Sequence, residues 1–365
     1  MINITIVSGA RPNFMKIAPI IKSILKQKEK GTPISYRLVH TGQHFDKAMS
    51  GDFFEQLDIP EPDSNLACGG GTQAAQTAAI MIKFEEELLS HRPTLVLVVG
   101  DVTSTMACTI TAKKLNIDVV HVEAGIRSGD MTMPEEINRI VTDSICDHFF
   151  TTSEKANENL RASNIEENRI HFVGNTMIDT LQANLGKIRK PDFFDQHSLS
   201  GASYFLLTLH RPSNVDDAEN LSVLLTEIMK ATAPHPVVFP VHPRTKQNLE
   251  KLNLEFDNLI LTTPQGYLEF IYLIKNAKGI VTDSGGITEE ATVLHIPCLT
   301  MRTSTERPET VTIGTNELIG DDLVKLSQNI QKIKEGNWKK GSIPPLWDGK
   351  TSDRIIDQII SVYKH

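Results

Sequence analysis

Short apolar runs alternate with segments of helical spacing along the first half of this 365-residue chain. The strand-like runs are residues 2–7, 36–40, 95–99, 118–122, 149–152 and 170–173. The helical segments are residues 14–25, 73–89, 105–115 and 134–145. Strands that alternate with helices in this way predict a parallel sheet covered by helices on both faces.

The same pattern restarts in the second half, with strand-like runs at residues 204–209, 237–241, 259–262, 279–282 and 298–300. A chain of this length fits two domains of ordinary size. We therefore predict an α/β protein with two Rossmann-like domains, residues 1–175 and 176–349, with the connection near residues 174–190. A bend rich in proline and glycine at residues 344–349 precedes a final amphipathic helix over residues 352–363.

Composition narrows the possible partners. The formal net charge of −8 argues against nucleic acid or an anionic membrane as the main partner. The four cysteines are far apart in sequence and suggest neither a disulfide framework nor a metal site. No apolar run approaches the roughly 18 residues that span a bilayer, and the N-terminus resembles a strand more than a signal peptide. We expect a cytoplasmic protein without a metal ion.

Polar side chains follow many of the predicted strands. They are Arg11, Gln43, His44, Asp101, Glu123, His210, His242 and Asp283. In open parallel sheets, ligands bind beyond the carboxyl ends of the strands, so these positions are candidates for one site. No G-x-G-x-x-G sequence follows the first strand, which disfavours a nicotinamide or flavin enzyme.

The segment from Val281 to Glu309 resembles a phosphate site. A strand leads into Ser284-Gly285-Gly286, which opens a predicted helix, and Arg307 follows in a later loop. Glycines allow close approach of backbone N–H groups, a helix N-terminus favours anions, and arginine binds phosphate through two hydrogen bonds. This combination predicts a diphosphate clamp, although a simple strand-loop-helix accounts for the local sequence equally well.

Three carboxylates of the first domain, Asp101, Glu123 and Glu135, are expected to face this clamp. Paired carboxylates can supply a base and an acid, and a clamped diphosphate is a good leaving group. Proton abstraction from a sugar carbon with departure of a nucleotide diphosphate suits these groups, and so does glycosyl transfer. The residues alone therefore predict a nucleotide-sugar enzyme and no more.

Ten short motifs make a more specific comparison possible. In order they are Gly9-Ala10-Arg11-Pro12 with Lys16, Gly42-Gln43-His44, Gly100-Asp101-Val102-Thr103-Ser104, His121-Val122-Glu123-Ala124-Gly125-Ile126-Arg127, Pro134-Glu135-Glu136-Ile137-Asn138-Arg139, Gly174-Asn175-Thr176 with Asp179, Leu209-His210-Arg211, Pro240-Val241-His242-Pro243, Asp283-Ser284-Gly285-Gly286-Ile287 with Glu289-Glu290, and Thr305-Glu306-Arg307-Pro308-Glu309. In this order and spacing the chain resembles the non-hydrolysing UDP-N-acetylglucosamine 2-epimerases.

The resemblance implies the two-domain GT-B fold of many glycosyltransferases, with UDP on the second domain and the sugar in a cleft. The C-terminal helix, residues 350–365, would return to the first domain. The implied reaction inverts C2 of UDP-GlcNAc to give UDP-ManNAc, by elimination of UDP to a 2-acetamidoglucal and re-addition. It implies no cofactor, a homodimer, and a role in surface polysaccharide precursor synthesis.

The resemblance also implies a role for individual residues. Asp101, Glu123 and Glu135 match the acid/base carboxylates, and His210 matches a catalytic, phosphate-contacting histidine. The matching substrate-binding positions are Arg11, Lys16, Gln43, His44, Arg139, His242, Gln265, Phe270, Ser284, Gly285, Gly286, Glu290 and Arg307. Among these, Gln265 and Phe270 would lie at the uracil end and Glu290 at the ribose.

Departures from the family pattern leave alternatives open. Asn13 stands where the common pattern has glutamate, which we interpret as a modest change in a loop. Asp46 and the run Gly69-Gly70-Gly71 replace residues of a second, activating substrate pocket, so we expect substrate activation to be weak or absent. Alternative functions are a 2-epimerase of UDP-2,3-diacetamido-2,3-dideoxy-glucuronate, a hydrolysing epimerase that releases ManNAc and UDP, a glycosyltransferase and a binding-only protein.

Overall fold

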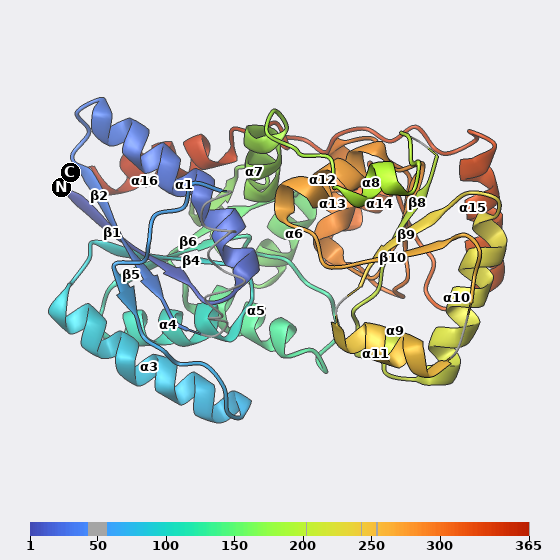
Figure 1. Cartoon of the computed structure of the whole chain (residues 1–365). Helices are drawn as coiled ribbons and strands as arrows, with labels where there is room; N and C mark the ends of the chain where they lie inside the picture. Colours follow the sequence, from blue (N-terminus) through green and yellow to red (C-terminus); the bar gives the residue numbers. More distant parts are fainter. Residues whose placement is uncertain (43–56, 202, 242, 253–254, 365) are drawn as a thin grey trace. The chain divides into compact units, whose positions relative to one another are not determined.

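The computed structural model describes residues 1–42, 57–201, 203–241, 243–252 and 255–364 (Figure 1). Contacts between Cα atoms divide the chain into two compact units. Unit 1 comprises Met1–Ala183 and Pro345–His365, and unit 2 comprises Asn184–Pro344. Each unit is described by itself below.

Unit 1 is built on a parallel sheet that contains seven strands in the described part of the chain. Its order is β3 (Ser64–Asn65), β2 (Ile34–His40), β1 (Ile2–Ser8), β4 (Leu95–Val99), β5 (Asp118–Val122), β6 (His148–Thr151) and β7 (Ile170–Phe172). The direction of strand order reverses between β1 and β4. This reversal is the topological switch point, where open α/β sheets bind their ligands.

Helices cover both faces of this sheet (Figure 1). On one face lie α1 (Arg11–Glu29) and α16 (Thr351–Tyr363), and on the other lie α3 (Gln73–Ser90), α4 (Thr103–Lys114) and α5 (Pro134–Ile145). All five residues of β4, Leu-Val-Leu-Val-Val, are buried, as expected for a strand between two helical layers. The prediction of an α/β fold with parallel sheets is confirmed.

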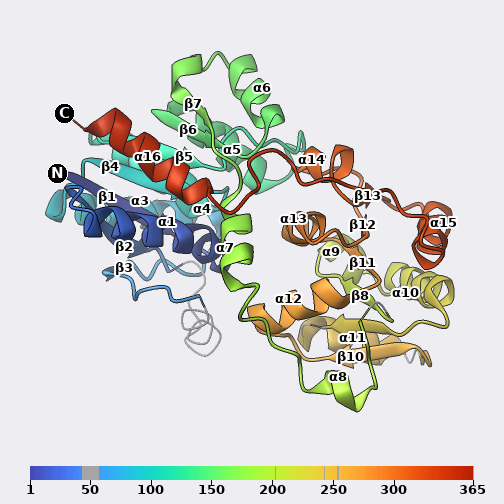
Figure 2. The ribbon, with the colours of Figure 1, turned by 90° about the horizontal axis from the view of Figure 1, so that it is seen from above.

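Helix α16 returns from the end of the chain to pack beside α1 (Figure 2). Its Ile355, Ile356 and Ile359 are buried, and its Asp353 accepts a hydrogen bond from the Ser23 hydroxyl at 2.8 Å. The last helix therefore belongs to unit 1 although unit 2 separates it in sequence.

The segment that the sequence pattern treats as a connection, residues 174–190, contains helix α7 (Thr176–Asn184). The Thr180 hydroxyl of this helix donates to the carbonyl of Met15 at 2.5 Å, and its Asp179 accepts from the backbone N–H of Thr351. Because these bonds tie α7 to α1 and α16, unit 1 extends to Ala183, whereas the sequence prediction ends the first domain at residue 175. Two shorter helices, α6 (Glu154–Ala162) and the 3-10 turn Glu167–Arg169, complete unit 1.

Unit 2 repeats the same topology. Within its described residues, six parallel strands lie in the order β10 (Leu259–Thr262), β9 (Val237–Pro240), β8 (Phe205–Thr208), β11 (Gly279–Thr282), β12 (Cys298–Thr300) and β13 (Asn316–Leu318). Its switch point lies between β8 and β11. The helices are α8 (Phe193–Gln196), α9 (Pro212–Val215), α10 (Ala218–Thr232), α11 (Pro243–Leu252), α12 (Tyr267–Asn276), α13 (Gly285–Val293), α14 (Pro308–Thr312) and α15 (Leu323–Lys334).

Strand β13 and helix α8 of unit 2 are absent from the sequence prediction. Strand β13, Asn-Glu-Leu, is too short and too polar to show an alternation of apolar residues. Its Asn316 is buried, and the Asn316 side-chain oxygen accepts a hydrogen bond from the Thr300 hydroxyl at 2.7 Å. Helix α8 is a single turn in a mostly polar stretch, and its Phe194 is buried against Tyr204 and Tyr272.

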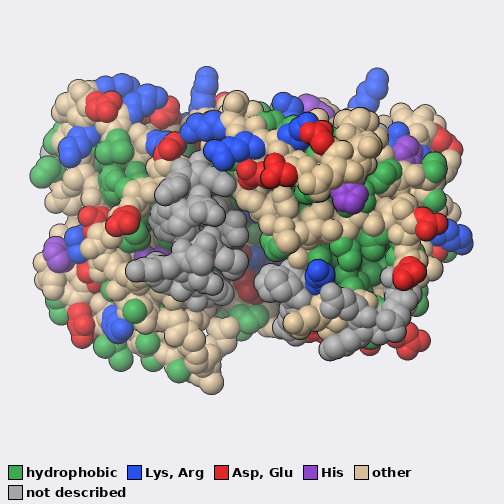
Figure 3. All heavy atoms as spheres, viewed as in Figure 1, with side chains coloured by type: hydrophobic (Ala, Val, Ile, Leu, Met, Phe, Trp, Pro, Cys, Tyr) green, Lys and Arg blue, Asp and Glu red, His purple; other side chains and the backbone are tan. Residues whose placement is uncertain are grey.

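The distribution of surface charge, the length of the helices and the grouping of possible metal ligands bear on which partners this chain can bind. Acidic and basic side chains are interspersed over the face drawn in Figure 3. None of the described helices combines the length with the hydropathy that a bilayer-spanning helix needs. The described residues also contain no group of three or more His, Cys, Asp or Glu side chains arranged to hold a metal ion.

Candidate active site

The carboxyl ends of β4 and β5 bring Asp101 and Glu123 to the switch-point edge of unit 1. The two strands pair in register up to Val99 and Val122, and the Gly100 N–H then bonds the carbonyl of Val122 at 3.0 Å. Asp101 follows this last bond on one strand, and Glu123 follows it on the other. The sequence prediction that both carboxylates follow strand ends is therefore met by the geometry, while their roles stay predictions.

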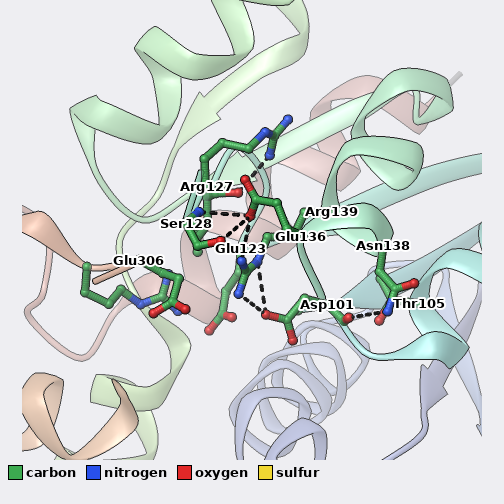
Figure 4. A network of polar contacts seen from close by, with 12 residues as sticks. Asp101, Thr105, Glu123, Arg127, Ser128, Glu136, Asn138, Arg139 and Glu306 are labelled. Carbon is green, nitrogen blue, oxygen red and sulfur yellow. Dashed lines mark hydrogen bonds and ion pairs between the residues drawn. The ribbon is translucent and has the colours of Figure 1, made fainter. Parts of the chain in front are cut away.

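Asp101 is held by helix α5 (Figure 4). Its Oδ2 accepts from Arg139 at 3.1 Å from Nε and 2.6 Å from Nη2, and its backbone carbonyl accepts from the Asn138 amide at 2.8 Å. A charge-assisted pair of this kind is shorter and stronger than a neutral hydrogen bond. Arg139, predicted to bind substrate, thus contacts the predicted acid/base group directly.

Glu123 is buried and its Oε2 lies 2.6 Å from Nζ of Lys16 on α1. The backbone φ of Glu123 is +70°, in the left-handed region that residues other than glycine seldom adopt. Strained backbone of this kind persists only where surrounding contacts enforce it, and it concentrates at functional sites. The Glu123 N–H bonds the carbonyl of Phe150 on β6 at 3.0 Å, which supplies one such contact.

Asn13 joins the ends of β1 and β4 across the switch point. Its side-chain oxygen accepts from the N–H groups of Gly9 and Ala10 at 3.3 and 2.9 Å, and its amide donates to the carbonyl of Val99 at 3.1 Å. The interpretation of Asn13 as a modest loop change is therefore wrong. A glutamate carries no N–H to donate to Val99, so this set of three bonds requires the amide.

The two acidic residues that open α5 have different surroundings. Glu136 is buried, and its carboxylate accepts from the N–H groups of Ser128 and Gly129 and from Arg139. Burial raises the pKa of Glu136, but the Ser128 and Arg139 hydrogen bonds outweigh it and hold that pKa below its usual value. Glu135 is only half-buried, one residue after the start of the helix. Acidic side chains in this first turn also suit the positive end of the helix dipole.

In unit 2, His210 follows β8 and Asp283 follows β11, on either side of the switch point. Asp283 has no exposed surface, and its carboxylate accepts from the backbone N–H groups of His210 and Arg211. Nδ1 of the exposed His210 ring lies 2.7 Å from Asp283 Oδ1. This contact orients the ring and assigns the Nδ1 hydrogen, so a neutral imidazole would carry its acceptor at Nε2.

Burial alone would raise the pKa of Asp283. The hydrogen bond and the charge of His210 act in the opposite direction, followed by the bonds from Arg211 and Asn214. Together they hold the pKa of Asp283 below its usual value, so Asp283 stays ionised beside His210 at neutral pH.

Helix α13 begins at Gly285 directly after β11, with Ser284 as its N-cap residue. The Ser284 side chain makes no capping bond, so it does not satisfy the first N–H groups of the helix. The Arg302 guanidinium lies beside this start, since a Cβ on Gly285 would be 3.6 Å from Nη1 of Arg302. Arg302 is itself held by Glu306 through two bonds of 2.8 and 2.7 Å. A helix start next to a guanidinium favours an anionic group.

Glu289 and Glu290 lie next to each other in α13, and both are buried. Glu289 is paired with Arg307, a predicted diphosphate contact. Burial, followed by the charge of Glu289, raises the pKa of Glu290 to about 8, while a hydrogen bond with Tyr267 offsets part of the rise. Glu290 is therefore largely protonated at neutral pH, and a neutral carboxyl group can both donate and accept hydrogen bonds.

We expect Glu290→Gln to flatten the pH dependence of stability between pH 5 and 8. An unfolded glutamate ionises near 4.5, whereas Glu290 in the folded chain ionises near pH 8. The folded state thus holds the proton through this window, and its stabilisation is lost as pH rises. Release of one proton limits the loss to about 1.4 kcal/mol per pH unit. Urea unfolding of wild type and variant at several pH values measures the difference.

The control for this experiment is Glu335→Gln, which removes an exposed carboxylate of the same unit. It should leave the pH slope of the wild type unchanged. Equal slopes in wild type and Glu290→Gln would show that Glu290 is ionised in the folded protein throughout this range.

The remaining predicted site residues are distributed as follows. Gln265 precedes α12 and donates to the carbonyl of Thr263 at 2.7 Å, and Phe270 lies half-buried within α12. Arg11 is the first residue of α1. Gln43, His44 and His242, with Asp46, lie outside the described residues. The three glycine and serine positions 284–286 are together at the start of α13.

Each unit therefore carries chemically distinct groups at its own switch point. Unit 1 presents carboxylates that are paired with cationic side chains, and a carboxylate can accept a proton. Unit 2 presents a helix start, an oriented histidine and buried arginine–glutamate pairs, and these groups suit an anionic nucleotide. Two Rossmann-type sheets of this order define a two-domain α/β protein of the GT-B type.

Comparison with known proteins identifies the family. The family model described as UDP-N-acetylglucosamine 2-epimerase matches residues 26–360. A UDP-N-acetylglucosamine 2-epimerase of Methanocaldococcus jannaschii is 42% identical over 97% of both chains. A Pseudomonas aeruginosa protein named UDP-2,3-diacetamido-2,3-dideoxy-D-glucuronate 2-epimerase is 41% identical over 86% of both. The chain belongs to the UDP-N-acetylglucosamine 2-epimerase family, as the motifs predicted.

A solved structure agrees with this assignment. The crystal structure of the Methanocaldococcus jannaschii UDP-GlcNAc 2-epimerase, in complex with UDP-GlcNAc and UDP, superposes with a TM-score of 0.86. Its sequence is 41% identical, and the match covers 99% of this chain and 100% of that one. The predicted fold class is thereby confirmed at the level of both domains.

Proposed function

We propose that this chain is a non-hydrolysing UDP-N-acetylglucosamine 2-epimerase, which interconverts UDP-GlcNAc and UDP-ManNAc. The observation that carries the proposal is the pair of carboxylates at the ends of β4 and β5, Asp101 with Arg139 and Glu123 with Lys16. Two carboxylates on adjacent strand ends suit the removal and return of one proton on a sugar carbon. Family membership supplies the substrate class.

In the proposed reaction, every proton and electron pair is accounted for without a cofactor. A carboxylate of unit 1 takes the proton from C2, the C2–H electron pair forms the C1–C2 double bond, and the C1–O bond breaks to release UDP. The intermediate is a 2-acetamidoglucal. Return of a proton to the opposite face of C2 and attack of UDP on C1 give the epimer. Asp101, Glu123 and Glu135 are the candidates for these proton transfers.

Unit 2 would hold UDP. The start of α13 at Ser284–Gly286, His210 and Arg307 are the proposed diphosphate contacts, since they offer N–H groups and positive charge. Glu290 would contact the ribose, and Gln265 and Phe270 the uracil. Arg11, Lys16, Gln43, His44, Arg139 and His242 are the further substrate contacts in the proposal.

Deuterium incorporation tests the reaction. Incubation with UDP-GlcNAc in deuterated water is expected to place deuterium at C2 of the recovered nucleotide sugars, because the abstracted proton exchanges with solvent before it returns. Nuclear magnetic resonance of the sugar ring measures the loss of the C2 proton. Free ManNAc that accumulates in step with UDP would instead show hydrolysis, and sugar transfer with C2 untouched would show a transferase.

A second substrate deserves a parallel assay, because the Pseudomonas relative is named for the diacetamido uronate. Faster turnover of that analogue than of UDP-GlcNAc would reassign the substrate while keeping the same C2 chemistry.

We also propose that the chain works as a homodimer in the cytoplasm and supplies a precursor of a surface polysaccharide. The support for these three points is membership of the family. Light scattering of the purified protein measures its oligomeric state directly and so tests the homodimer.

A further inference from the structure

His121 lies between valines in β5, and it has no exposed surface. Its Nε2 lies 2.8 Å from the carbonyl oxygen of Gly100, and its Nδ1 lies 2.7 Å from Oδ1 of Asp143. A carbonyl oxygen can only accept a hydrogen bond, so Nε2 must carry a hydrogen. The protonation of Nδ1 then depends on Asp143.

Asp143, on α5, is buried and accepts two further hydrogen bonds at its Oδ2. The donors are the backbone N–H of Gly125 at 3.0 Å and Nη1 of Arg127 at 2.6 Å. Burial raises the pKa of Asp143, but the charge and hydrogen bond of His121, followed by those of Arg127, hold that pKa below its usual value. An ionised carboxylate has no hydrogen to give, so Nδ1 of His121 also donates.

The two backbone groups that this pair binds lie just beyond the ends of β4 and β5. The ladder between the strands ends with the bond from the Gly100 N–H to Val122. Gly100, Glu123 and Gly125 then all adopt positive φ, of +67°, +70° and +78°. A Cβ on Gly125 would lie 2.3 Å from the carbonyl oxygen of Ala156, so this turn is also closely packed. Side chains hold these turns together with the backbone bonds from the Glu123 and Ala124 N–H groups to the Phe150 carbonyl.

We propose that His121 and Asp143 form a buried charged pair that positions the two acid/base carboxylates relative to each other. His121 holds the turn that carries Asp101 through the Gly100 carbonyl, and Asp143 holds the turn that follows Glu123 through the Gly125 N–H. The proposal rests on the proposed function, since it assigns these residues to the epimerase reaction. Both are positioning residues: His121 is fully buried and acts through the backbone.

Such a pair matters because small displacements have large kinetic effects. A shift of about 1 Å in a reacting group can lower a rate by roughly 10²-fold. Within the proposed pair the opposite charges of His121 and Asp143 offset each other, which permits their burial. Loss of the His121–Gly100 bond would release the Asp101 turn without removing any group that touches substrate.

Two isosteric variants separate positioning from charge. In His121→Gln the amide nitrogen takes the place of Nε2 and can still donate to Gly100, whereas in His121→Asn it takes the place of Nδ1 and can donate only to Asp143. Both variants lose the positive charge. We expect His121→Asn to lower kcat by about 10²-fold and His121→Gln by about tenfold, with the dissociation constant for UDP unchanged in both.

His171→Phe is the matched control. His171 is a half-buried histidine of the same sheet, in β7, and its Nε2 lies 3.2 Å from Nδ1 of His148. Its loss should leave kcat within about twofold of the wild type. All values of kcat are referred to folded protein, measured by near-ultraviolet circular dichroism.

Equal losses of kcat in the Gln and Asn variants would overturn the positioning role, and so would wild-type kcat in His121→Asn. A measurement on the unaltered protein needs no variant to fold. Nitrogen-15 resonance of labelled histidine should show both ring nitrogens of His121 protonated at pH 7.5, and a neutral ring would overturn the charged pair. If the wild type itself showed no exchange at C2, the proposed function would fail, while the resonance result would still decide the charged pair.

Discussion

Replacement of Glu123 by glutamine should lower turnover of UDP-GlcNAc by about 10²- to 10⁴-fold, with UDP binding intact. Glutamine preserves the size of the side chain but cannot take a proton from carbon at neutral pH. Glu123 is buried at the end of β5, so water has little access to replace it, and Lys16 is its 2.6 Å partner. Steady-state turnover and deuterium incorporation at C2 should fall together if Glu123 transfers the C2 proton.

The control for this prediction is Glu158→Gln, on the exposed surface of α6, where Glu158 forms an ion pair with Lys155. Turnover in that variant should match the wild type, since a surface pair of this kind contributes little. Turnover of Glu123→Gln within tenfold of wild type, with the protein folded, would remove Glu123 from the acid/base assignment and leave Asp101 and Glu135 as candidates.

The elements that sequence alone locates well are those whose side chains repeat with a clear period. The segments Leu95–Val99, Asp118–Val122 and Pro134–Ile145 are predicted to the residue, because a continuous apolar run, a valine-rich run and a proline at the helix start mark them in turn. The polar residues that follow these runs were found by position alone, since parallel strands place their carboxyl ends at one edge.

Elements defined by distant partners carry no such local signal. Helix α7 reads as a connection, and only its bonds to Met15 and Thr351 show that it belongs to unit 1. Strand β13 pairs with β12 although two of its three residues are polar, and a hydrogen bond between Thr300 and Asn316 replaces the missing apolar pattern. The secondary structure and position of these two segments depend on tertiary contacts more than on the propensity of the short segments themselves.

The candidate site shows the same division. The carboxylates and the glycine-opened helix are recognisable from residue type, but the residues that hold them are not. Asn13, Asn138 and Asp143 bond groups far away in sequence, for example across 86 residues from Asn13 to Val99. The local signal for His121 is a histidine between two valines of a predicted strand, and its meaning depends on Asp143, which comes 22 residues later.

Replacement of Asp179 by alanine is expected to destabilise unit 1 by about 3–5 kcal/mol. Asp179, on α7, accepts from the backbone N–H groups of Thr351 and Ser352 at 3.0 and 2.7 Å and from the Ser352 hydroxyl at 2.6 Å. It thus caps α16, whose own N-cap residue, Lys350, makes no side-chain capping bond. Alanine would leave three buried donors without this acceptor, each at a cost of about 1–3 kcal/mol.

Hydrogen exchange locates this effect, because loss of the cap should act first on the helix that is capped. The amides of α16 should exchange about 150- to 4,000-fold faster in Asp179→Ala, the equivalent of about 3–5 kcal/mol. Asp179→Asn keeps one acceptor oxygen, so its α16 amides should exchange at a rate between those of the wild type and Asp179→Ala. Asp357→Ala removes an exposed aspartate of α16 that bonds only Gln27 among the contacts described, and should change stability by less than about 0.5 kcal/mol. Unchanged exchange in Asp179→Ala would mean that packing of Ile355, Ile356 and Ile359 holds α16 without the cap.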